Sequence, residues 1–334
     1  MKAHYPILLL ILTVFAACQT EVEYNGEITT PKPVIFARTS VDSLRQFHQC
    51  FVQQSTFFLD NIQGGQFLAD AKVEWQLNDG NRYPFVFVSD SAGYLPSKPL
   101  PTVNAGDRIT LYVSHPTYGA TLATQTLPDI LHVQPRNMQI HTDTLSERIT
   151  QKKDTRIRVY NQRQRIDIDL AFLPYPRQND DVVQITAKAV YHPNADTLYQ
   201  RSAYLSSREP LFHTLTTDRD LGLIDDISSL IREDTRRYDA FFIPVSMLQE
   251  SRTASLTVVT RQDTTLPDSL LISVLTMTRD TWLYHATMEQ QSSFQGAIIG
   301  LGQEEKVQVF GNFEGDVIGA YIATNQQTIR YPIR

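Results

Sequence analysis

Cysteine is scarce in this chain, which contains only Cys18 and Cys50 among 334 residues. Two cysteines exclude the dense disulfide framework of small secreted proteins and the paired-cysteine zinc sites. Cys50 lies in residues 46–54, a segment whose neighbours indicate a strand. We therefore expect its thiol to be buried and to pack as a small hydrophobe.

Compact catalytic motifs are also missing. The sequence has no His-Glu-x-x-His, no Gly-x-Ser-x-Gly and no phosphate-binding glycine-rich loop. Its histidines are scattered singly, so two metal ligands at zinc spacing never occur together. A nucleophilic Cys50 beside His48 would lack the third, orienting group that such catalysis needs. The sequence therefore predicts a protein that is not an enzyme and has no cofactor, although a hydrolase with a dispersed site stays an alternative.

An excess of basic residues is lacking as well. The chain has 30 basic and 36 acidic residues, a formal net charge of −6. Nucleic-acid binding requires a concentrated basic face, so this balance argues against a nucleic-acid partner. The densest basic stretch, residues 151–165, is interleaved with or followed by Asp154, Asp167 and Asp169. We interpret it as a solvated strand face, with a binding patch as the alternative.

Only one long apolar run is present, at residues 7–17, with Lys2 ahead of it. An apolar helix of that length spans about 16 Å, roughly half the hydrocarbon core of a bilayer, so it is too short to cross a membrane. A basic residue, a short apolar run and small residues behind it are typical of a secretory signal peptide. We assign residues 1–17 to such a signal.

Ala16 and Ala17 directly before Cys18 resemble the lipobox at which bacterial lipoprotein signals are cut. The resemblance implies that Cys18 becomes the new N-terminus and carries acyl chains; an ordinary cleavable signal is the alternative. Two or more acyl chains, at about 0.8 kcal/mol per buried methylene, hold a protein stably at a membrane. Glu21 and Glu23 resemble the acidic signal that exports such lipoproteins to the outer face of the outer membrane, or they belong to a solvated stalk.

After a polar stalk at residues 18–30, residues 31–130 show short strand patterns separated by turn residues. Residues 71–77 alternate apolar and polar side chains, and Asn-Asp-Gly at 78–80 is a hairpin signal that leads to a partner strand at 83–88. About seven strands at this spacing predict an immunoglobulin-like or transthyretin-like β-sandwich. The overall class is mainly β.

Residues 131–334 are predicted to form a second, predominantly β domain. Residues 166–172 contain an Ile-Asp-Ile-Asp alternation, which exposes an acidic face and buries the opposite one. Two short helices are predicted at residues 225–237 and 279–290, each with an apolar stripe behind a first-turn aspartate.

Two sets of residues are candidate ligand sites. Carboxylates at alternate positions around a glycine can wrap a calcium ion, and this weak pattern occurs at Asp218, Asp220, Asp225 and Asp226. A polar loop that ends in a helix cap is the other interpretation, and we favour it. Trp75 and Trp282 are either sugar-stacking platforms or core residues, and their apolar neighbours favour the core.

Several segments in order along the mature chain resemble a known family. They are residues 33–36, 68–73, 92–94, 104–107, 123–128, 282–284, 307–315 and 319–321. On these residues the chain resembles the Bacteroidota-type surface lipoproteins grouped as domain of unknown function 4249. Similar lipoproteins accompany outer-membrane TonB-dependent transporters, which implies a role in capturing or handing over a nutrient. The resemblance carries no catalytic residues.

The sequence therefore leads us to expect a non-enzymatic outer-membrane lipoprotein, tethered by acyl chains and exposed at the cell surface in preference to the periplasmic face. It would bind a ligand or a TonB-dependent transporter. The alternative is a structural envelope protein whose domains space other components. A concave charged or aromatic pocket would favour binding, and flat, continuous sheet faces would favour scaffolding.

Overall fold

The computed structural model describes residues 30–42, 45–55, 66–152, 155–176, 180–194, 197–212, 239–261, 263, 265–298 and 310–333. Several predictions fall outside these residues: the signal peptide, Cys18, Glu21 and Glu23, the acidic candidates at 218–226 and the helix predicted at 225–237.

The described chain is mainly β, as predicted, and its sixteen strands form one mixed sheet. The strands of the N-terminal part are β1 (Pro33–Asp42), β2 (Arg45–Gln54), β3 (Gln66–Phe67), β4 (Lys72–Leu77), β5 (Arg82–Ser89), β6 (Gly93–Pro96), β7 (Arg108–His115) and β8 (Gly119–Thr126). Those that follow are β9 (Val133–Lys152), β10 (Thr155–Phe172), β11 (Val182–Asn194), β12 (Thr197–Ser206), β13 (Phe241–Pro244), β14 (Arg252–Val259), β15 (Ser269–Met277) and β16 (Ile318–Pro332). A 3-10 helix, η4 (Val245–Leu248), and an α-helix, α2 (Arg279–Ile298), complete the described elements.

The predicted hairpin at residues 78–80 is confirmed. β4 and β5 pair antiparallel, with Trp75 opposite Tyr83. Asn78 adopts a positive φ of 50°, the left-handed conformation that asparagine tolerates best after glycine. The turn chemistry that the sequence shows locally thus sets the register of these two strands.

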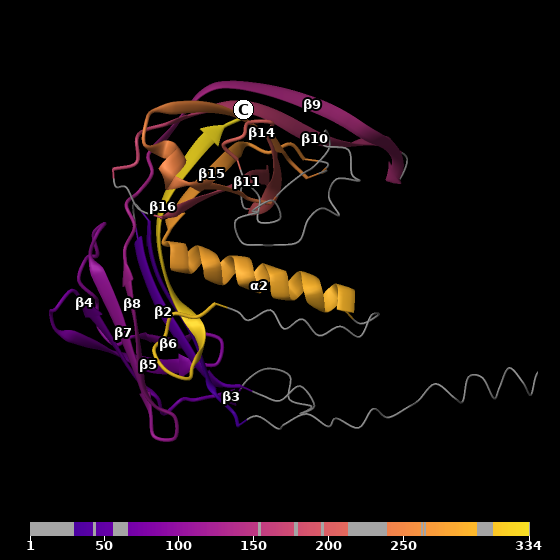
Figure 1. Cartoon of the computed structure of the whole chain (residues 1–334). Coiled ribbons are helices and arrows are strands. Elements are labelled where there is room, and N and C mark those ends of the chain that lie inside the picture. Colours follow the sequence, from indigo (N-terminus) through magenta and orange to yellow (C-terminus); the bar gives the residue numbers. More distant parts are fainter. Residues whose placement is uncertain are drawn as a thin grey trace, which may run out of the picture.

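One hydrophobic core lies among β1–β8 and forms the lower lobe in Figure 1. Trp75 is 1% exposed and Cys50 is completely buried in it, so the predictions of core packing for both are confirmed. Burial raises the pKa of the Cys50 thiol. A thiol held protonated in this way is a packing residue.

A second core lies in the upper lobe, between β10, β11, β14 and β15. On β10 the alternation predicted from the sequence is confirmed, because Ile166 and Ile168 are at most 1% exposed while Asp167 and Asp169 lie on the other face. One side of β10 therefore packs in this core, and the opposite side faces solvent.

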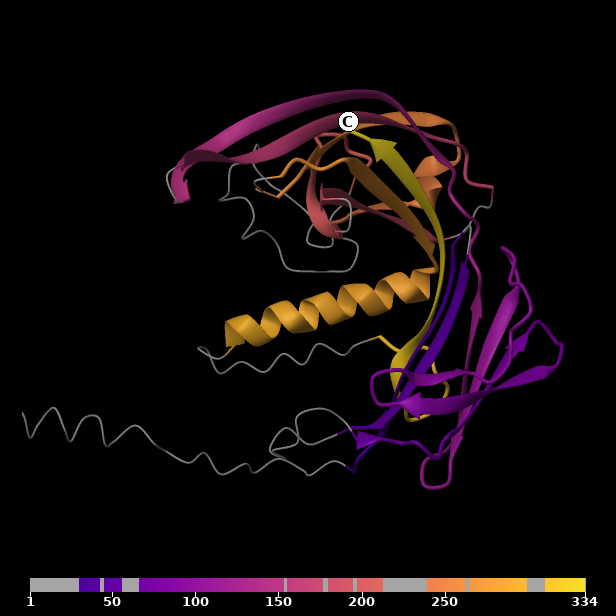
Figure 2. The same cartoon turned by 180° about the vertical axis from the view of Figure 1, so that it is seen from behind.

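Strand β16 runs through both lobes (Figures 1 and 2). It pairs parallel with β1, opposite Val34 to Asp42, and antiparallel with β15. Its first half places Tyr321 and Ala323 in the lower core, and Ile329 and Tyr331 pack against the upper one. The predicted division into two domains at residues 130 and 131 stays a prediction. Among the described residues, the structure shows one continuous sheet with two large cores and a smaller cluster around Trp282.

The segment between β8 and β9 is held against β15 and β16. Leu131 is 1% exposed, and its backbone N–H donates to Thr276 Oγ1 at 3.4 Å. Asn325 Nδ2 donates to the carbonyl of Pro128 at 3.1 Å, and Val133 N–H donates to Gln327 Oε1 at 2.9 Å. These bonds satisfy backbone groups that burial would otherwise leave without a partner.

Gly319 occupies the point where β16 comes closest to β1. Its φ is +121°, a conformation open in practice only to glycine. A Cβ atom built on it would overlap the backbone of Ile35, at the carbonyl oxygen in particular. The parallel pairing of β1 with β16 therefore depends on the absence of a side chain here.

The residues just before β16 include the end of the segment 307–315, one of the segments that carry the family resemblance. Asn312 Nδ2 donates to the Tyr321 carbonyl and Asn312 Oδ1 accepts the Tyr321 N–H, both at 2.8 Å. The neighbouring Phe313 is buried in the lower core. The backbone of Glu314 is hydrogen-bonded to β8: its N–H donates to the Leu122 carbonyl, and its own carbonyl accepts from the Thr121 hydroxyl. The segment is thus a structural clip on β8 and β16.

A buried polar network centres on the Tyr321 hydroxyl. Trp75 Nε1 donates to this oxygen at 3.1 Å, and Thr39 Oγ1 lies 2.8 Å from it. Thr39 Oγ1 also lies 3.1 Å from His48 Nδ1. The network joins β1, β2, β4 and β16, so these strands are linked by side chains as well as by backbone pairing.

Replacing Tyr321 with phenylalanine is expected to lower the free energy of unfolding by about 2 kcal/mol, because the buried Trp75 N–H loses its acceptor. The matched control is Tyr112→Phe, which removes a bond of 2.8 Å to Gln76 between half-buried side chains. Water can replace that partner, so we expect a loss of about 0.5 kcal/mol. Denaturant unfolding measures both. Equal losses would contradict the role given to Tyr321.

Helix α2 begins within the predicted segment 279–290 and continues to Ile298. Trp282, 9% exposed, and Ala286 pack with residues of β11, β13 and β15, so core packing of Trp282 is confirmed. The helix lies between the two lobes in both views (Figures 1 and 2). In the part of the chain that the structure describes, no helix combines the length and apolarity that a membrane crossing requires.

Candidate ligand-binding groove

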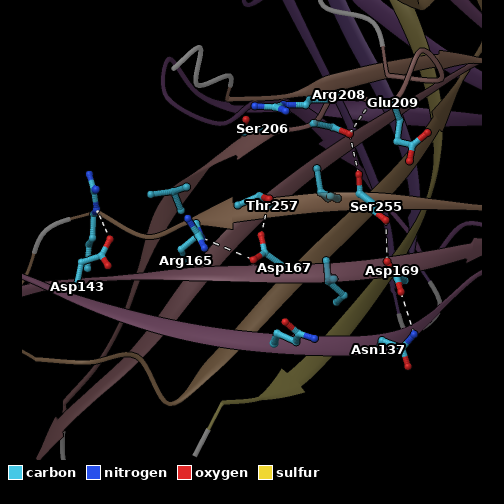
Figure 3. Close-up of a pocket in the computed structure, with 16 residues that line it drawn as sticks. Asn137, Asp143, Arg165, Asp167, Asp169, Ser206, Arg208, Glu209, Ser255 and Thr257 are labelled. Atoms are coloured by element: carbon cyan, nitrogen blue, oxygen red, sulfur yellow. Dashed lines mark hydrogen bonds and ion pairs between the residues drawn. The ribbon is translucent and has the colours of Figure 1, made fainter. Parts of the chain in front are cut away.

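A polar groove of about 700 Å³ lies on the solvent side of β9, β10 and β14, beside residues 206–209 (Figure 3). Four side chains of β10 contribute to it through the two-residue period of the strand: Arg163, Arg165, Asp167 and Asp169. The isoleucines between them anchor the strand in the upper core. The packing that buries one face of β10 therefore presents these four charged side chains on the other.

Strand register brings hydroxyl groups opposite the two aspartates. Asp167 pairs with Thr257, and Asp169 pairs with Ser255, both on β14. On the other side of β10, the register with β9 shifts between Ile168 and Leu170, a β-bulge or irregularity. Asn137 of β9 points toward Asp169 at this place (Figure 3).

Asp169 is held by two neutral donors. Its Oδ1 accepts from the Ser255 hydroxyl at 2.8 Å, and its Oδ2 accepts from Asn137 Nδ2 at 2.9 Å. Hydrogen bonds from Asn137 and then Ser255 hold the pKa of Asp169 below its ordinary value, because they favour the charged carboxylate. Asp169 is therefore an oriented, ionised acceptor.

The two carboxylate oxygens of Asp167 have different neighbours. Its Oδ1 accepts from Thr257 Oγ1 at 2.6 Å. Its Oδ2 lies 3.6 Å from Arg165 Nε and 3.6 Å from Nε2 of His141 on β9. A further ion pair, 3.2 Å long, joins Arg163 Nε to Asp143 Oδ2. Two pairs of opposite charge, Arg165–Asp167 and Arg163–Asp143, therefore lie in the groove.

This arrangement suits binding more than acid–base chemistry. A general acid needs a carboxyl whose pKa is raised toward neutral pH, whereas the pKa of Asp169 is lowered. Among the described residues, no three or more His, Cys, Asp or Glu side chains are placed so that they could hold a metal ion. The groove offers fixed hydrogen-bond acceptors and donors to a ligand.

A second cavity, of about 560 Å³, lies between β2 and the segment after β6. Phe47, Leu95 and Pro99 line it, with His48 at its inner side. Burial lowers the pKa of His48 to about 4, so the ring is neutral at pH 7. Its ring lies edge-on to Trp75, with the centroids 5.3 Å apart. His48 therefore belongs both to this cavity and to the buried polar network.

The groove was partly visible in the sequence. The Arg-x-Arg-x-Asp-x-Asp alternation at residues 163–169 places four charges on one face, and the basic part was interpreted there as a solvated strand face with a binding patch as the alternative. Asn137, Ser255 and Thr257 were missed. Ser255 lies 86 residues from Asp169 along the chain, and no local pattern reports such a pairing.

Comparison with known proteins identifies the family of this chain. A search of curated proteins finds no match. The model of a family described as "Domain of unknown function (DUF4249)" matches residues 21–330, nearly the whole chain and both lobes of the sheet. The chain therefore belongs to the DUF4249 family.

Proposed function

We propose that this protein is a lipid-anchored component of the bacterial outer membrane that binds a ligand in the groove on β9, β10 and β14 and works beside a TonB-dependent transporter. It acts without catalysis. The lipobox-like residues before Cys18 support the anchor, and Glu21 with Glu23 support export to the cell surface. We also propose that the N-terminal lobe is an immunoglobulin-like or transthyretin-like β-sandwich.

The observation that carries the binding role is the charged groove itself. Its carboxylates and arginines are held in place by neighbouring strands, which prepares them for a ligand. A purely structural envelope protein, the second candidate, has no use for such a concave charged site. The continuity of the sheet over all sixteen described strands is the feature that favours this second candidate.

The anchor is tested by replacing Cys18 with serine. We expect the wild-type protein to sediment with membranes and to incorporate radiolabelled palmitate, and the variant to lose the label and leave the membrane fraction, because the acylated sulfur is gone. Cys50→Ala is the matched control and should stay labelled, since the Cys50 thiol is buried. A Cys18→Ser protein that is processed at the signal yet stays with the membrane would contradict the anchor.

The transporter role is tested by crosslinking in intact cells, followed by solubilisation and purification of the full-length protein. We expect an outer-membrane β-barrel transporter among the crosslinked partners. Protease treatment of intact cells, in the same samples, reports whether the protein faces outward. Recovery without any barrel partner would favour the scaffold.

A further inference from the structure

We infer that the groove binds an uncharged oligosaccharide, a stretch of neutral sugar rings recognised through their hydroxyl groups. This inference rests on the proposed binding function and names the chemical class of its ligand. It follows from the lining of the groove, its charge balance and its open shape across three strands.

Most of the residues that line the groove are polar or charged. Of the 16 lining residues only Ile168, Leu256 and Val259 are apolar, and the side chains of all three are buried. A peptide or a lipid would find no apolar pocket for its side chains or tails. A polyhydroxylated ligand requires none, because its own surface is rich in donors and acceptors.

Two donors, Arg163 and Arg165, are followed along β10 by two acceptors, Asp167 and Asp169. Asp167 and Asp169 are two residues apart on one strand face, which separates their Cα atoms by about 7 Å. Each carboxylate oxygen has two lone pairs and receives at least one partner from the sheet, which leaves capacity for a ligand hydroxyl. Arg163 and Arg165 contact their aspartates through Nε, and each guanidinium has further N–H groups that can donate to a ligand.

Charge balance favours a neutral ligand. The lining contains three arginines and four acidic residues, and opposite charges are paired at Arg163–Asp143 and Arg165–Asp167. A strongly charged ligand at either of these pairs would meet a group of the same sign beside its partner. Sugar hydroxyls both donate and accept, so they satisfy carboxylates and guanidinium groups equally well.

An aromatic residue marks one end of the groove. Tyr204 lies opposite Val259 and is two residues before Ser206, which places it on the groove side of β12. The guanidinium of Arg261 lies 5.1 Å from the centre of its ring. Tyr204 is half-buried and Arg261 is exposed, and the strand registers align Tyr204 with Val259 on β14 and Arg165 on β10. The pair would form a wall where a further sugar ring passes.

The test is native gel electrophoresis of the full-length protein in detergent, with soluble polysaccharides in the gel. The neutral probes are dextran, mannan, xylan and laminarin; the comparison probes are polygalacturonate and, in a separate titration, a mixture of casein peptides. We expect at least one neutral polymer to retard the protein. Arg165→Ala and Asp167→Asn should each raise its dissociation constant about tenfold or more, since each loses a hydrogen bond to a charged group.

Lys98→Ala is the matched control, because Lys98 is exposed at the second cavity and not in the groove. It should leave the retardation unchanged. Thermal unfolding of every variant separates lost binding from lost folding, and Arg165, with a side chain 53% exposed, can be removed without disturbing the core. Binding of polygalacturonate or peptides alone, neutral binding that survives both groove variants, or no binding at all would overturn the inference.

The crosslinking experiment keeps the two proposals separate. If the transporter is crosslinked while every neutral polymer fails, the ligand class is wrong and the proposed function stands. If a neutral polymer binds in the groove and no transporter is found, the oligosaccharide inference stands and the transporter role falls.

Discussion

Replacing Gly319 with alanine is expected to lower the free energy of unfolding by about 4 kcal/mol or more, a loss large enough to unfold many domains. The added Cβ would overlap the Ile35 backbone at the β1–β16 pairing, and alanine disfavours a φ of +121°. Neither backbone can move away cheaply. β1 is also held by β2 along ten residue pairs, and β16 by β15 along nine.

Gly315→Ala is the matched control for this prediction. Gly315 also has a positive φ, of 85°, but nothing lies within 4 Å of an added Cβ. Its substitution should therefore cost only the conformational term, about 1–2 kcal/mol. Denaturant titration of both variants by circular dichroism gives the two values. Similar losses for the two glycines would show that the close approach to Ile35 contributes little.

Acid is expected to destabilise the protein through His48 by about 3 kcal/mol between pH 7 and pH 4. Burial lowers the pKa of His48 in the folded protein from the ordinary value of 6.5 to about 4. Between these two values the unfolded chain binds a proton that the folded protein does not. Stability from this group is therefore complete above about pH 6.5 and is lost as the pH falls toward 4.

The variant that isolates this effect is His48→Gln, which keeps a polar side chain near Thr39 and removes the titration. Its free energy of unfolding should fall by about 3 kcal/mol less than that of the wild type over the same pH range. The carboxylates that titrate in this range are common to both proteins and cancel in the difference. Urea unfolding at pH 7, 6, 5 and 4 measures it. Parallel pH profiles would contradict the neutral, buried state of His48.

The predictions for Gly319 and His48 concern the same region of the lower core, around the Tyr321 network. Gly319 allows β16 to approach β1, and two residues later Tyr321 enters the lower core, where Thr39 links it to His48. The histidine therefore has a hydroxyl partner and no charged partner among its described contacts. Desolvation is then the dominant influence on its pKa.

Local patterns predicted the elements well. Alternation at residues 71–77 and 166–172 placed Trp75, Ile166 and Ile168 in cores, and the Asn-Asp-Gly turn paired β4 with β5. The helix at 279–290 was predicted because its apolar stripe recurs at helical spacing, although it ends eight residues later. Each of these features depends on neighbours in the chain, so the sequence contains the signal directly.

The candidate groove was predicted only in part. The sequence alternation shows which side chains of β10 share the solvent face, but not that β9 and β14 flank that strand. Whether the face is a bare surface or a groove depends on Asn137, Ser255 and Thr257, which come from partners far along the chain. The acidic cluster at 218–226, singled out in the sequence, lies outside the described residues, so it stays a prediction.

The sequence by itself determined the mainly β class, the hairpin at 78–80, the inward and outward faces of the strands and the DUF4249 resemblance, because all of these are encoded in local periodicity and short segments. Only the tertiary structure decided that β16 pairs with β1, 284 residues apart at Ser40 and Thr324, and that three strands assemble a charged groove. Strand order and register depend on side-chain packing between distant segments, and that information is distributed over the whole chain.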